Sequence, residues 1–126
     1  MEAKRILIVD DDQDLVLATR LILESAGYTV ETASTGEAGL EEMRASTPDL
    51  VLMDVMMANP LDGYHTTQQI ADDPALSRVP VLMVSSIGTS QYAETFPTNQ
   101  HLAIRDFLSK PVEPELLLAK IRRYLQ

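Results

Sequence analysis

The sequence predicts an α/β fold, in which a doubly wound, five-stranded parallel sheet carries helices on both faces. Two observations predict this fold. Short, near-continuous apolar runs alternate five times with longer segments of helical spacing, as is typical of parallel strands covered on both sides. No internal repeat, low-complexity stretch or linker divides the chain, so we expect its 126 residues to form one domain over positions 1–126.

The first strand and helix are predicted from an apolar run and a helical period. Ile6–Val9 is a short apolar run that ends at Asp10, and residues 13–26 then show helical spacing. Gly27 is the expected stop of this helix. Its apolar face is predicted to consist of Leu15, Ala18, Ile22 and Ala26.

A second strand and helix, and a third strand, follow in the same way. Thr29–Ala33 is predicted as a strand. Ser34 and Glu37 have the spacing of a capping box, which predicts a helix that runs to about Ala45. Leu50–Asp54 is a third apolar run, and it ends in a carboxylate.

The second half of the chain continues the alternation with one interruption. Pro97 interrupts any helix over residues 88–105, where the fourth helix would be expected. The apolar face of the last helix is predicted from Leu117, Ile121, Tyr124 and Leu125. The later elements are a helix after Asp62-Gly63 that ends before Pro74, strands over Val79–Ser85 and Asp106–Ser109, and a helix that starts at Pro114.

Composition excludes several classes of function. The net charge of −9 disfavours direct binding to nucleic acid. The absence of cysteine excludes disulfides and thiolate zinc sites, and it favours a cytoplasmic location. No apolar run approaches the roughly 20 residues of a membrane span, and the first residues do not resemble a signal peptide. We therefore expect no membrane association.

Polar and charged side chains follow four of the five predicted strands. In a parallel sheet these strand ends share one edge, and ligands bind there where the strand order reverses. Asp10, Asp11 and Asp12 follow the first strand, Asp54 ends the third, Ser85 ends the fourth, and Lys110 follows the fifth.

These side chains predict a site for phosphoryl transfer. Carboxylates that lie close together repel one another, so they are expected to hold a cation or share protons. Ligands that are all oxygen atoms suit Mg²⁺ or Mn²⁺ better than zinc. With a cation, the Lys110 ammonium and the Ser85 hydroxyl around it, Asp54 is the expected nucleophile.

Four segments together resemble the receiver domain of two-component response regulators, of the kind found in chemotaxis regulators. They read ILIVDDDQD, DLVLMDVMM, VPVLMVSS and DFLSKPVEP, and the resemblance runs from about Lys4 to Leu125. It implies a flavodoxin-like (βα)5 fold. It also implies that the domain is no classical enzyme but catalyses the phosphorylation of its own Asp54.

The resemblance assigns a metal site. Asp11 is expected to bind Mg²⁺ directly and Asp10 mainly through water. Asp54 is the expected phosphoacceptor and a further ligand. Met56 is expected to contribute its backbone carbonyl, which any side chain permits.

The resemblance also assigns a switch and partners. The Ser85 hydroxyl is expected to move toward the phosphoryl group, which Lys110 neutralises, and Phe107 then turns inward. The implied donor is a histidine kinase or a histidine phosphotransfer protein. The readout would be the face of the fourth and fifth helices, which would act on an output domain or protein of unknown identity.

The chain departs from the family pattern at three places. The segment between Asp54 and Asp62 is one residue longer than usual, and residues 88–105 do not follow the family pattern. Met56 and Ile87 occupy the two positions at which the family places groups that act on the hydrolytic water. Neither side chain hydrogen-bonds water well, so we expect phospho-Asp54 to hydrolyse slowly.

Other interpretations compete with the receiver. Each of these residues, taken alone, has a simpler structural interpretation. Acids after a strand often cap helices, and an aromatic such as Phe107 usually packs in the core. A pseudo-receiver would signal without phosphate. A haloacid-dehalogenase-type phosphatase would use Asp10 as its nucleophile and Asp12 beside it, but it leaves Asp54 unexplained.

Overall fold

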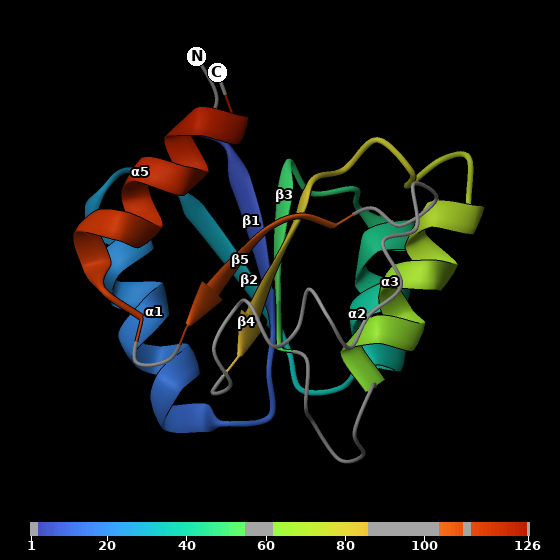
Figure 1. Ribbon diagram of the computed structural model, residues 1–126, viewed down its shortest axis with the longest axis horizontal. Helices are drawn as coiled ribbons and strands as arrows, with labels where there is room; N and C mark the ends of the chain where they lie inside the picture. Colours follow the sequence, from blue (N-terminus) through green and yellow to red (C-terminus); the bar gives the residue numbers. More distant parts are fainter. Residues whose placement is uncertain (1–2, 55–61, 86–103, 110–111, 126) are drawn as a thin grey trace.

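A computed structural model describes residues 3–54, 62–85, 104–109 and 112–125 (Figure 1). Up to β4, which is followed by the gap at residues 86–103, their helices and strands alternate along the chain as the sequence predicts. In chain order they are β1 (Arg5–Val9), α1 (Gln13–Ser25), β2 (Thr29–Ala33), α2 (Gly36–Ala45), β3 (Leu50–Asp54), α3 (Asp62–Asp72), β4 (Val81–Ser85), β5 (Ile104–Ser109) and α5 (Pro114–Tyr124).

The five strands form one parallel sheet in the order β2-β1-β3-β4-β5. Helices α1 and α5 cover one face of the sheet, and α2 and α3 cover the other (Figure 1). The predicted α/β fold with a doubly wound five-stranded parallel sheet is therefore confirmed. Residues 88–103, most of the range in which a fourth helix would be expected, lie outside the described part of the chain, and Ile104 and Arg105 belong to β5.

Each face of the sheet has its own apolar cluster, because successive strand residues point to opposite faces. Leu7 and Val9 pack into the cluster on the α2 and α3 side, whereas Ile6 and Ile8 pack into the cluster under α1 and α5. All five residues of β3 are buried. This double burial explains why the strands appear in the sequence as continuous apolar runs.

The buried face of α1 differs from the predicted one. The buried residues are Val16, Thr19 and Leu23, whereas Ala18 and Ala26 are exposed. The predicted face is right in part, because Leu15 and Ile22 are half-buried and Ile22 packs against the cluster under α1 and α5. The centre of the buried face lies one residue further along, and one residue turns a helix by about 100°. The buried face does not stand out as an apolar period in the sequence, because a polar threonine lies in its middle. The predicted face of α5 is correct, since Leu117 and Ile121 are buried and Tyr124 and Leu125 are half-buried.

Three predicted boundaries also change for local reasons. The N-cap of α2 is Thr35, whose hydroxyl accepts from the Ala38 N–H, so Ser34 and Glu37 do not form the predicted capping box. β4 begins after Pro80, which has no N–H for a strand ladder. β5 begins two residues earlier than predicted, and its register against β4 shifts where Arg105 is an extra residue. At the end of α1, Gly27 has a φ of 97°, as the predicted stop requires.

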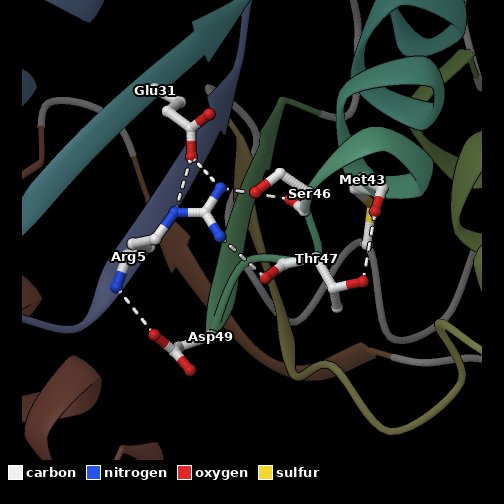
Figure 2. Close-up of polar contacts among 6 residues, drawn as sticks. All are labelled: Arg5, Glu31, Met43, Ser46, Thr47 and Asp49. Carbon is white, nitrogen blue, oxygen red and sulfur yellow. Dashed lines mark hydrogen bonds and ion pairs between the residues drawn. The ribbon is translucent and has the colours of Figure 1, made fainter. Parts of the chain in front are cut away.

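Arg5 fixes the start of β1 against its two neighbouring strands (Figure 2). Its guanidinium donates to the Glu31 carboxylate on β2, and also to the Ser46 and Thr47 carbonyls before β3, at 3.1 Å each. Its backbone N–H donates to Asp49 at 2.8 Å. These hydrogen bonds, several of them to charged groups, thus set the register of β2, β1 and β3 at the amino-terminal ends of the strands, opposite the end at which Asp54 lies.

Candidate functional site

Three carboxylates converge where the sheet order reverses between β1 and β3. Asp10 follows β1 and Asp54 ends β3, and these strands are neighbours. With Asp11, each offers an oxygen atom, and these oxygens all lie within 4.8 Å of one another. Asp10 and Asp54 are each only 4% exposed, whereas Asp11 is open to solvent. The site is therefore a cluster of two buried carboxylates and one exposed carboxylate, at the point where such sheets bind ligands.

The third acid of the run has a different position. The Asp12 carboxylate accepts hydrogen bonds from the N–H groups of Asp14 and Leu15 at 3.1 Å each, so it is the N-cap of α1. The Asp12 N–H donates to Asp10 Oδ1 at 2.9 Å. Asp12 therefore starts the helix and orients the Asp10 carboxylate.

An apolar floor lies beneath the two buried carboxylates. A cavity of about 10 Å³, roughly the space of one water molecule, is lined by Asp10 and Asp54 together with Ile8, Leu52 and Thr19 among others. Charges interact more strongly beside such a floor than in bulk water. Thr19 is not predicted to lie at this site, because a lone threonine on a helix carries no functional signal in the sequence until the buried face of the helix is known.

The donor set fits a hard divalent cation. All three side chains offer carboxylate oxygens, which are the ligands that Mg²⁺ and Mn²⁺ prefer, whereas zinc sites favour nitrogen and sulfur ligands. Two of the carboxylates are buried, so a bound cation would offset repulsion that water screens poorly there. Asp10, Asp11 and Asp54 are the residues that would hold it.

The other predicted site residues are placed only in part. Ser85 ends β4, where it pairs with Ser109, and the preceding residue Val84 pairs with Asp54. The Ser85 backbone is therefore one position beyond Asp54 on the adjacent strand. Met56 and Lys110 lie outside the described residues, so their roles stay predictions.

Phe107 lies on β5 and is half-buried against the cluster on the α2 and α3 side. Its backbone is tied to α5. Lys120 Nζ donates to the Phe107 carbonyl at 3.0 Å and to Asp106 Oδ1 at 2.8 Å, and that carboxylate accepts the Phe107 N–H at 2.8 Å. Burial by itself would raise the pKa of Asp106, but the hydrogen bonds from Lys120 and Phe107 and the Lys120 charge hold it below its ordinary value of 3.8.

We expect Lys120→Met to lower the unfolding free energy by about 1–2 kcal/mol at pH 7. Because the folded-state pKa of Asp106 is depressed, the pair stabilises the fold above the pKa of the unfolded chain. That stabilisation is lost as the pH falls through the folded-state pKa. Urea unfolding from pH 7 to pH 3 should therefore show the difference from the parent shrinking with acid. Lys4→Met, at an exposed lysine, is the control; a difference that is independent of pH would contradict this assignment.

The order of the strands, together with the acidic residues that follow the first strand and end the third, is the pattern of a receiver domain. The family model of the response regulator receiver domain matches residues 6–122, and the chain belongs to this family. Among its relatives is Protein PilH of Pseudomonas aeruginosa, which is 37% identical over 122 residues, or 96% of this chain and 97% of PilH. The transcriptional regulatory protein CseB of Streptomyces avermitilis is 35% identical over 99% of this chain and 50% of its own length.

Solved structures agree with the family assignment. A response regulator from Chloroflexus aurantiacus superposes with a TM-score of 0.87 at 30% identity, covering 98% of each chain. The chemotaxis response regulator CheY4 of Vibrio cholerae gives a TM-score of 0.86 at 25% identity, over 98% of this chain and 100% of its own. The predicted resemblance to receiver domains is confirmed.

The family sets the general role of the chain. It is a receiver domain of two-component signal transduction, in a family that works with histidine kinases and output domains rather than as classical enzymes. The chain spans about half the length of the transcriptional regulators that it matches. In the described part of the chain, no helix has the length and apolar character needed to cross a membrane.

Proposed function

We propose that this domain takes a phosphoryl group from a phosphohistidine onto Asp54 and thereby switches an output surface. The observation that carries the proposal is the convergence of Asp10, Asp11 and Asp54 at the reversal of strand order. The donor would be a histidine kinase or a histidine phosphotransfer protein. We further propose that residues 1–126 act as one domain and that the compartment is the cytoplasm, in keeping with the absence of cysteine.

In the proposed step, an Asp54 carboxylate oxygen attacks phosphorus while the bond from phosphorus to the donor imidazole breaks. The imidazole keeps the bonding electrons and takes up a proton. Mg²⁺ or Mn²⁺, when bound, would neutralise charge on the phosphoryl oxygens. Asp10, Asp11 and the Met56 carbonyl would hold the ion.

Three further residues have proposed roles after the transfer. Lys110 would bind the phosphoryl oxygens, and the Ser85 hydroxyl would move toward them. Phe107 would follow into the space that Ser85 leaves, and the change would bias a two-state equilibrium. The half-buried position of Phe107 on the strand next to Ser85 supports this order.

The test is labelling by acetyl phosphate with and without Mg²⁺, followed by intact mass and peptide mapping. The expected result is one phosphoryl group per chain, dependent on Mg²⁺ and absent from Asp54→Asn. Labelling of Asp10 would instead support the phosphatase, although the Asp12 carboxylate already serves as the α1 cap. A folded domain that takes no label would support the phosphate-independent pseudo-receiver.

A further inference from the structure

The two edges of the sheet differ in how their backbone groups are used. On β5, the Arg105 carbonyl lies 3.2 Å from the Tyr124 hydroxyl, and the Phe107 carbonyl accepts from Lys120. The Phe107 N–H donates to Asp106. Side chains of α5 and of β5 itself therefore occupy three of the backbone groups along this edge, which makes it less open to an added strand.

The other edge is β2, and its outward backbone groups can be assigned from its pairing. The Thr29 N–H donates to the Lys4 carbonyl, and the Ala33 carbonyl accepts from the Asp10 N–H, so these residues face β1. Successive residues of a strand direct their backbone N–H and C=O groups to opposite sides, so the backbone groups of Val30 and Thr32 point away from β1. No hydrogen bond between described residues places a side chain on the backbone of Val30 or Thr32.

A groove of about 460 Å³ runs beside this open edge. It is lined by the end of β2 and by the outer face of α2, which contributes only small residues and two acids. Three of the seven lining residues are alanines, so the groove has room for the side chains of an added segment. The α2 residues that line it are Ala38, Glu41, Glu42 and Ala45.

The charge of the groove selects its occupant. Glu41 and Glu42 are exposed and make no ion pair with another described residue. The nearby cations are used elsewhere, since Arg5 pairs with Glu31 (Figure 2) and Arg44 pairs with Asp73. An added strand directs alternate side chains to one face, so lysine or arginine at every second position would meet this acidic wall.

From these contacts we propose that the β2 edge and α2 form a docking groove for an extended basic segment of a partner protein. The segment would add to the sheet as a sixth strand, with backbone hydrogen bonds to Val30 and Thr32 and its basic side chains over Glu41 and Glu42. This surface lies on the opposite edge of the sheet from β5 and Phe107. The proposal is independent of the phosphorylation of Asp54.

The first test uses fluorescein-labelled Lys-Thr-Lys-Thr-Lys-Thr-Lys and measures anisotropy in physiological salt. A peptide with the same residues in two blocks, four lysines and then three threonines, controls for attraction to the net charge. We expect the alternating peptide to bind more tightly, and the double variant Glu41→Lys, Glu42→Lys to weaken it by about tenfold or more. Glu37→Lys with Glu115→Lys makes the same charge change outside the groove. Equal loss in both double variants, or no preference for alternation, would overturn the proposal.

The second test asks whether the peptide pairs with the strand edge. Amide hydrogen exchange should show fast exchange at Thr32 in the free protein and protection when the peptide binds, while Glu31 is protected in both states. Thr32→Pro removes only an outward N–H, so the sheet should fold and the peptide should not bind. Unchanged exchange at Thr32 would overturn the proposal even if this variant fails to fold. If, without peptide, the Thr32 amide became more protected as the protein concentration rose, the occupant would be a second copy of this chain, and the proposal would also be overturned.

Discussion

Asp11→Asn should make the Mg²⁺-free domain more stable and should remove most of the stabilisation that Mg²⁺ provides. Asp11 is exposed, so the change leaves no cavity, but its carboxylate lies within the cluster of Asp10 and Asp54. Removing one of three like charges relieves repulsion, which we expect to be worth about 1 kcal/mol, or a few degrees in Tm.

In the presence of Mg²⁺ the order of stability is expected to reverse, with the parent more stable than Asp11→Asn. A ligand present at about 100 times its Kd stabilises the fold by about 2.7 kcal/mol. The parent should gain stability in this way, whereas Asp11→Asn, with one ligand fewer, should bind Mg²⁺ at least about tenfold more weakly. Thermal unfolding in EDTA and across a Mg²⁺ titration measures both effects on the same two proteins.

Asp14→Asn is the matched control for this experiment. Asp14 is also an exposed acid at the start of α1, but it lies outside the cluster of three. It should keep the full response to Mg²⁺. The cation site would be wrongly assigned if Asp11→Asn were no more stable than the parent in EDTA and still gained as much from Mg²⁺.

The parts of the fold that the sequence predicts well are those in which burial is uniform. β3 is buried along its whole length, so its apolar run and its boundaries coincide. The convergence of Asp10 and Asp54 also follows from sequence, because parallel strands bring their carboxyl ends to one edge. Neither inference needs the identity of a distant contact.

The failures occur where a distant contact decides the outcome. The buried stripe of α1 includes Thr19, whose burial depends on the sheet beneath it and not on its own polarity. The link between Lys120 and Asp106 joins a helix to an edge strand, and no local period marks it.

Met56→Asn should shorten the half-life of phospho-Asp54 by about tenfold or more, since a side chain that positions or polarises the attacking water can contribute at least that factor. By resemblance to the family, the two positions that act on this water are those of Met56 and Ile87. Both side chains are apolar, so the parent should hold its phosphoryl group for long periods. Decay of the labelled protein in Mg²⁺, after acetyl phosphate is removed, measures the half-life.

Met57→Asn places the same amide one residue further along and should leave the decay unchanged. If Met56→Asn decays no faster than the parent, the slow-hydrolysis hypothesis fails, although Asp54 could still be the phosphoacceptor. If it holds, the domain is equipped to accept a phosphoryl group and poorly equipped to lose it to water. The duration of the signal would then depend on transfer back to a histidine or on a separate phosphatase, and not on a rate set by this domain.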